Sequence, residues 1–271
     1  MKKIIITLIC LFIGLSANAK QIQFAQISDA NYNMADEKSS QLLDWVIISV
    51  NKNKPDFTVF LGDNIGKSKE DNLTDFLKKT KAIKNPYYIV TGNKDSYKMG
   101  GLNRNDYWKI VRKNNKYNKK SEKSYYSFEI NSEFLGVVMD GAVPFVQGQH
   151  GIFPEEQLKW LDKILKDNKN KSIIIFQHFP IVDPAENKFL TTLEKEKYQE
   201  ILNKHKNVVI ISSGHFDTSK VTVDEKGISH ISSPSLVTPD YIYNIVTVDY
   251  KKYPFRKVKI NDIKVTSIDL Q

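Results

Sequence analysis

Cysteine is nearly absent from this sequence. The 271 residues include a single cysteine, Cys10. One thiol cannot form a disulfide within the chain, and it cannot build a structural zinc site from several cysteines. Hydrophobic residues make up 41% of the chain and aromatic residues 11%, which is enough for a sizeable core. We therefore expect packing of that core to stabilise the fold.

Arginine is also scarce. Of the 40 basic residues only Arg104, Arg112 and Arg256 are arginines, although the formal net charge is +9. Proteins that read nucleic-acid sequence favour arginine at base edges, so we expect no specific nucleic-acid partner. A lysine-rich surface attracts anionic substrates or an anionic envelope surface, but an ordinary solvated surface is the simpler interpretation.

Long hydrophobic runs are missing too, apart from residues 4–15. This run follows two lysines and precedes S-A-N-A at 16–19. The order of basic, apolar and small residues is typical of a signal peptide cleaved after Ala19, and the run is too short to span a bilayer comfortably. We expect residues 1–19 to be removed. Residues 20–271 would then form one exported domain, periplasmic or extracellular, with no integral membrane segment.

The apolar residues that remain alternate between helical and strand-like spacing. Positions 42, 43, 46, 47 and 50 repeat at helical spacing after Asp36, which predicts a helix with Asp36 as its N-cap. Short apolar runs bounded by turn residues predict strands. We expect helices at 36–52, 69–83, 107–112, 153–165 and 191–205, and strands at 21–28, 57–61, 87–90, 124–130, 133–140, 172–176, 208–211, 220–224, 228–232, 241–249 and 255–269.

The order of these elements predicts an α/β fold with two sheets. Alternating strands and helices in the first part predict parallel pairing, with helices packed on the sheet. The last four strands follow one another without helices, which predicts antiparallel pairing at the C-terminal end. No linker-like or repeated stretch interrupts the chain, so we expect a single domain.

Polar side chains that bind metals follow five of the predicted strands. They are Asp29, Asp63, Asn93, His178 and His215. Each alone has an ordinary explanation, because Asp and Asn are common in turns. Ligands in α/β proteins gather beyond the carboxyl ends of strands, where loops bring distant residues together. Five such residues at five strand ends therefore predict a metal site.

The stretches around these residues resemble the calcineurin-like metallophosphoesterases. That family has D-x-H, G-D, G-N-H-D, a lone His before Pro, and G-H-x-H. This chain has I-S-D-A-N at 27–31, L-G-D-N at 61–64, T-G-N-K-D at 91–95, F-Q-H-F-P at 176–180 and S-G-H-F-D at 213–217. The resemblance covers about residues 22–250. It implies a two-sheet β-sandwich flanked by helices in four layers, αββα.

The resemblance also implies two metal positions that share Asp63. The first would be held by Asp63, Asn93, His178 and His215, a set that is intact here and suits Mn, Fe or Zn. The second would be held by Asp29, Asn31, Asp63 and Asp217, where Asn31 and Asp217 replace family histidines. This all-oxygen set suits Mn, Mg or Ca, or stays empty. A tyrosine that compensates for the first histidine in the purple acid phosphatases is Gly66 here.

Lys94 replaces the third family histidine, which by resemblance donates a proton to the leaving group and is oriented by the following acid, here Asp95. Three roles stay open for Lys94. Its amine donates a proton or clamps a phosphate, helped by a nearby metal that lowers its pKa. Alternatively its ammonium pairs with Asp29, Asp95 or Asp217 and replaces a missing metal charge, or it points to solvent.

Two functions follow from the resemblance. The first is an exported phosphoesterase that hydrolyses a phosphate mono- or diester by metal-activated water, with a phosphorylated small-molecule or macromolecular substrate. The second is a catalytically inactive relative that binds a phosphorylated ligand, a metal or a protein partner. The three replacements spare the first metal position, which favours the enzyme.

Overall fold

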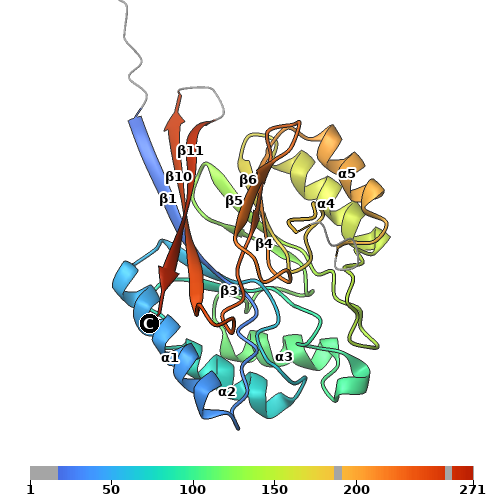
Figure 1. Ribbon diagram of the computed structural model, residues 1–271. Helices are drawn as coiled ribbons and strands as arrows, with labels where there is room; N and C mark the ends of the chain where they lie inside the picture. The colour runs from blue at the N-terminus through green and yellow to red at the C-terminus, as the bar shows by residue number, and fades with distance from the viewer. Residues whose placement is uncertain (1–17, 186–190, 254–257, 271) are drawn as a thin grey trace, which may run out of the picture.

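The protein is two β-sheets packed face to face, with helices on both outer faces (Figure 1). The computed structural model describes residues 18–185, 191–253 and 258–270, so most of the predicted signal peptide lies outside the described residues. Figure 1 shows α1 (Glu37–Asn53), α2 (Glu70–Thr80) and α3 (Arg104–Asn114) on one side, and α4 (Glu155–Asp167) and α5 (Lys195–Lys204) on the other. The expected four layers are confirmed.

Within the described residues, the first sheet has the strand order β11-β10-β1-β2-β3 and the second the order β4-β5-β6-β7-β9-β8. The first contains β1 (Asn18–Ile27), β2 (Phe57–Phe60), β3 (Tyr87–Ile89), β10 (Ile242–Lys252) and β11 (Lys259–Asp269). The second contains β4 (Tyr126–Glu129), β5 (Phe134–Val138), β6 (Ser172–Phe176), β7 (Val208–Ser213), β8 (Lys220–Val223) and β9 (Ser229–Ser232).

The antiparallel pairing predicted for the C-terminal strands is present between β8 and β9 and between β10 and β11, but the two pairs lie in different sheets. β9 pairs parallel with β7 and carries β8 at the edge of the second sheet. β10 instead crosses to the first sheet, where it pairs antiparallel with β1 from Asn18↔Lys252 to Gln26↔Asn244. Each of the two sheets has a free edge after its parallel strands, and these C-terminal strands satisfy its backbone hydrogen bonds.

Local sequence explains where the helices begin. Asp36 caps α1 as predicted, because its side chain accepts a hydrogen bond from the backbone N–H of Lys38. α3 begins three residues earlier than predicted, because Asn103 caps it by accepting from the N–H of Asp106 at 3.0 Å. Its buried Trp108 donates to Thr91 Oγ1 at 3.1 Å and ties this helix to the end of β3.

An aromatic cluster joins the two sheets. Phe24 stacks on Phe57 at 5.2 Å between ring centroids and meets Phe176 edge-on at 5.4 Å. Phe176 belongs to the second sheet and also stacks on Phe128 at 6.0 Å. These rings hold β1, β2 and β6 in fixed relative positions, so the loops that follow the three strands are positioned by the same core.

The described residues contain no helix of the length and apolarity that crossing a membrane requires. This finding agrees with the sequence after residue 19, where no long apolar run occurs.

Phe176→Ala should lower the free energy of unfolding by about 3–5 kcal/mol, because it leaves a cavity between the sheets. The matched control is Ile48→Ala on α1, whose side chain is 64% exposed; it should change stability by no more than about 0.5 kcal/mol. Urea denaturation followed by circular dichroism measures both. Equal effects of the two substitutions would contradict this account of the core.

Candidate metal centre

Three polar atoms surround His178 Nε2 at the ends of the central strands. His178 Nε2 lies 3.1 Å from Asn93 Oδ1, 3.2 Å from His215 Nδ1 and 3.5 Å from Asp63 Oδ1. These atoms come from the loops after β3, β6, β7 and β2. His178 and Asp63 are almost completely buried, at 0% and 1% exposed. The structure thus brings together the complete first metal set.

Backbone carbonyls determine which ring nitrogens carry protons. His178 Nδ1 lies 2.8 Å from the carbonyl of Leu61, and His215 Nε2 lies 3.0 Å from the carbonyl of Gln149. A carbonyl oxygen only accepts, so these two nitrogens are the donors. In a neutral imidazole the other nitrogen then holds a lone pair. His178 Nε2 and His215 Nδ1 therefore face each other as lone pairs, as metal-binding histidines do when a second partner fixes the tautomer.

A proton on His215 Nδ1 would prevent this nitrogen from binding a metal. The surroundings of His215 disfavour that proton. Burial, and then the nearby His178, lower the pKa of His215 to about 3. The ring is neutral at pH 7 and its Nδ1 is free to bind a cation.

The distances from His178 Nε2 to its three neighbours are those expected between ligands of a single ion. Metal–ligand bonds of about 2.1 Å separate neighbouring ligands by about 3.0 Å in an octahedron and about 3.4 Å in a tetrahedron. The three distances from His178 Nε2 span 3.1 to 3.5 Å. Atoms of Asp29, Asp63 and His178 also lie within 4.8 Å of one another in a buried group. The donors present suit a divalent metal ion.

The backbone is strained at these positions. Among the described non-glycine residues, eight have positive φ, and five of them belong to the predicted ligand sets: Asp29, Asn31, Asp63, His215 and Asp217. This conformation is costly for residues with a side chain and persists where the surroundings impose it. Such a concentration of strain marks these loops as a functional region.

Close packing around the site also requires glycine. Gly62 has a φ of +94°, and a Cβ there would lie 2.7 Å from His178 Nδ1. A Cβ on Gly92 would lie 2.1 Å from the backbone nitrogen of Asp63. The glycine before each ligand in G-D and G-N therefore allows the loops after β2 and β3 to approach each other.

The Lys94 side chain turns into the site rather than to solvent. Its Nζ lies 3.2 Å from Asp63 Oδ2 and 3.0 Å from Asn31 Oδ1, and its backbone N–H donates to Asp63 Oδ1 at 2.8 Å. One of the three open roles paired Lys94 with Asp29, Asp95 or Asp217, but its partner carboxylate is Asp63. Burial lowers the pKa of Lys94, but Asp63 and then Asp29 outweigh it, so the net shift is upward.

Asp95 does not contact the Lys94 side chain. Its carboxylate accepts from the N–H of Ile65 at 3.0 Å, the N–H of Gly92 at 2.8 Å and the amide of Asn64 at 2.8 Å. Asp95 is fully buried beneath the site and joins the loop after β2 to the loop after β3. Asp95 therefore positions these two loops. It does not orient the side chain of residue 94, as the resemblance implied.

The second ligand set is less well assembled. Asp29 is buried, and Asn31 donates from Nδ2 to the carbonyl of Asp29 at 3.1 Å while its Oδ1 faces Lys94. Asp217 is exposed, and within the described chain it forms no hydrogen bond or ion pair. Burial, opposed by His178 and reinforced by Asp63, raises the pKa of Asp29 to about 6.

Sequence reasoning missed the supporting residues. The carbonyls of Leu61 and Gln149 carry no side-chain signal, so no pattern could have revealed them. Asn64 follows Asp63 directly, and its amide donates to Val90 O, Asp95 Oδ2 and Tyr107 Oη. A polar residue beside G-D at a strand end was visible in the sequence, but it was not assigned a role.

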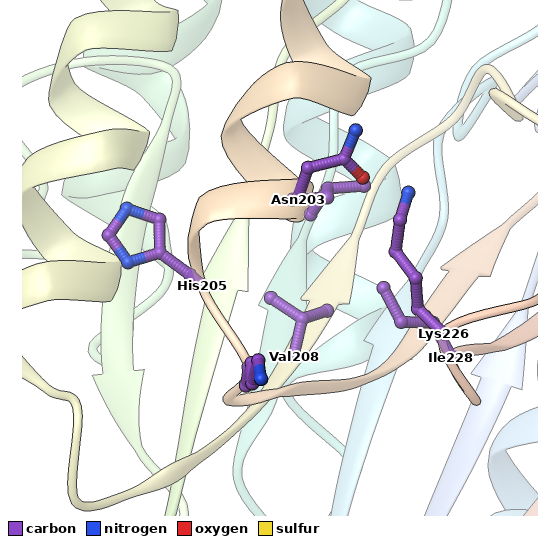
Figure 2. A pocket seen from close by; sticks show the side chains of 7 residues that line it. Asn203, His205, Val208, Lys226 and Ile228 are labelled. Atoms are coloured by element: carbon purple, nitrogen blue, oxygen red, sulfur yellow. The ribbon is translucent and has the colours of Figure 1, made fainter.

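A separate hollow lies far from these residues. It has a volume of about 450 Å³ and is lined by residues of α5, β7 and the turn before β9, including His205, Val208, Lys226 and Ile228 (Figure 2). It opens at the amino end of β7, whereas the metal centre is at the carboxyl end. His205 Nε2 pairs with Asp162 Oδ1 at 2.8 Å. This hollow is not part of the candidate centre.

Comparison with known proteins agrees with the sequence resemblance. The model of the calcineurin-like phosphoesterase family matches residues 22–216. Probable glycerophosphodiester phosphodiesterase GpdQ of Arcobacter nitrofigilis is 25% identical over 179 residues, which is 65% of this chain and 61% of that protein. The manganese-dependent ADP-ribose/CDP-alcohol diphosphatase of Danio rerio is 29% identical over 36% of this chain and 31% of its own. Both matches span less than two thirds of the relative's length.

The fold has solved counterparts. The crystal structure of a dimetal phosphatase from Danio rerio superposes with a TM-score of 0.67, covering 92% of this chain and 99% of that one. The sequence identity is 18%, so this likeness concerns the fold.

Asp95→Asn should destabilise the protein by about 1–3 kcal/mol, because an amide cannot accept from all three donors. Burial, and then Asp63, raise the pKa of Asp95 from 3.8 to about 7. As the pH rises, the Asp95 carboxyl therefore loses its proton in the unfolded chain before it does so in the folded protein. The stability due to the protonated group is complete below about pH 4 and is lost as the pH rises towards 7.

The loss caused by Asp95→Asn should accordingly be larger at pH 5 than at pH 7.5 in urea denaturation. Asp240→Asn, at an exposed position, is the control and should show neither effect. A cost for Asp95→Asn that equals the control at both pH values would contradict the positioning role.

Proposed function

The chain belongs to the calcineurin-like phosphoesterase family, and we propose that it is a metal-dependent hydrolase of phosphate mono- or diesters. The observation that carries the proposal is that Asn93 Oδ1, His215 Nδ1 and Asp63 Oδ1 all lie within 3.5 Å of His178 Nε2. Four facing acceptors repel one another unless a cation lies among them.

The first metal set would hold this ion through Asp63, Asn93, His178 and His215. Two imidazoles, a carboxylate and an amide suit Mn, Fe or Zn, and the manganese dependence of two relatives makes Mn the first ion to test. When bound, a divalent ion supplies Lewis-acid polarisation of the phosphoryl group and activates water as the nucleophile.

The chain's own residues bind and orient the substrate. Lys94 has three N–H donors, of which Asp63 and Asn31 accept two. Its side chain is 34% exposed, so a third donor is open to a phosphoryl oxygen at the mouth of the site. The surplus of lysine on the surface attracts anionic substrates over a longer range. Lys94 therefore serves as a fixed phosphate clamp.

A second candidate function is an inactive protein that binds a phosphorylated ligand, a metal or a protein partner. The observation in its favour is that Lys94 is already paired with Asp63, in the position where the family resemblance implies a proton-donating histidine. Turnover separates the two candidates, since only the enzyme hydrolyses a phosphate ester.

The N-terminal segment supports a further proposal, that the protein is exported. Basic, apolar and small residues precede Lys20 in the order of a cleaved signal peptide. Expression of the full chain in a bacterium, followed by N-terminal sequencing of the product outside the cytoplasm, should give Lys20 as the first residue. A product that keeps its N-terminus inside the cytoplasm would refute export.

His178→Ala should abolish both metal binding and turnover. The purified protein, loaded with Mn²⁺ and desalted, should hold one ion and hydrolyse an aryl phosphate mono- or diester. Loss of a ligand should lower turnover by at least about 100-fold, since even loss of a ligand's supporting partner costs 10- to 100-fold. Metal content is measured by mass spectrometry, and turnover by absorbance.

The control is His205→Ala, which removes a histidine from the opposite end of β7. It should keep the ion and the activity. A wild-type protein that holds the ion without any turnover would support the binding protein instead. Turnover by His178→Ala at the wild-type rate would refute the site.

A further inference from the structure

We propose that the Lys94 ammonium occupies the second cation position, so that the centre holds one divalent ion per chain. This inference rests on the proposed function in one respect, because it assumes that the first ion binds. It differs from the paired ions that the family resemblance implies.

The contacts of Asp63 divide its carboxylate between two cations. Oδ1 faces His178 Nε2 at 3.5 Å, on the side of the first metal set. Oδ2 lies 3.2 Å from Lys94 Nζ, on the opposite side. In a paired centre this carboxylate would bridge two ions. Here the ammonium takes the second place, and its charge offsets that of the neighbouring carboxylates.

Asn31 is oriented towards the ammonium rather than towards an ion. Its Nδ2 donates to the carbonyl of Asp29 at 3.1 Å, which fixes the amide so that Oδ1 accepts from Lys94 Nζ at 3.0 Å. An amide oxygen that already accepts from an ammonium is not free to bind a metal. Asn31 and Lys94 both replace family histidines, and their side chains are hydrogen-bonded to each other. The two replacements therefore act together.

The other ligands of the second metal set do not make up for the loss of Asn31. Asp29 Oδ2 accepts from Ser28 Oγ and from the N–H of His215 at 3.1 Å. A replacement ligand at Gly66 is excluded, because a Cβ there would lie 2.7 Å from the carbonyl of Asn31. In the part of the chain that the structure describes, Asp217 is exposed and has no hydrogen bond or ion pair. Of the second set, Asp29 and the shared Asp63 are then the buried carboxylates left for a second ion.

The backbone keeps Lys94 in place. Its own N–H donates to Asp63 Oδ1 at 2.8 Å, and the turn that precedes it is tied down by the bond from the Gly92 N–H to Asp95. The lysine can leave the site only by rotating its side chain away from both Asp63 and Asn31.

The test counts bound Mn²⁺ ions. Metal-free protein is saturated with Mn²⁺ and desalted, and the ratio of metal to protein is measured by mass spectrometry. Electron paramagnetic resonance distinguishes isolated Mn²⁺ from a spin-coupled pair. Wild type should hold one isolated ion. A protein with Asn31→His and Asp217→His regains family ligands but keeps Lys94, and it should still hold one.

Adding Lys94→Ala to those two substitutions should raise the ratio from one to two and produce a coupled pair. Lys98→Ala, at an exposed position four residues further on, is the matched control in the same background and should leave one ion. Circular dichroism and thermal unfolding establish that each variant folds.

Two ions in the wild type, or two in the protein that regains the histidines while Lys94 is present, would overturn the proposal. One ion after Lys94→Ala in the folded triple variant would also overturn it. These results leave the proposed function standing if the wild type hydrolyses a phosphate ester. A wild type with no ion and no turnover would instead refute the proposed function, and this inference with it.

Discussion

The carboxylate of Asp63 is the group on which the rest of the centre depends. It is buried, it follows a glycine at the end of β2, and its own backbone is strained at a φ of 50°. Its two oxygens face His178, the Lys94 backbone and the Lys94 ammonium. A charge in this position is unfavourable unless cations and N–H donors surround it, so the loops around it are constrained together.

The buried acids show the same constraint. Asp29, Asp63 and Asp95 all follow strand ends and have almost no exposure. Burial, together with neighbouring carboxylates, raises the pKa of Asp29 and of Asp95. A compact protein tolerates such a cluster only where positive charge or hydrogen bonds offset it. Here Lys94 provides one charge, and a divalent ion among the four facing acceptors would provide the other.

The sequence was most informative about elements and ligands. Alternation of strands and helices predicted the two sheets and the outer helices, and the strand-end pattern predicted His178 and the three ligand residues around it. It was less informative about pairing. β9 lies parallel to β7, while β10 crosses to the other sheet, and no local pattern distinguishes these choices because they depend on which sheet edge is free. The predicted start of α3 is three residues late, because the helix begins directly after its N-cap Asn103.

What the sequence by itself determined is the set of residues that reaches the strand ends, and through it the family. Each of these residues follows a strand directly, so its place along the chain is also its place at the sheet edge. The tertiary structure alone decided what those side chains do there. The partner of Lys94, the inward turn of Asp95 and the lone pairs of the two histidines depend on carbonyls and amides from loops far apart in sequence. Their meeting requires the packed sheets, because only the shared core sets the distance between the loops.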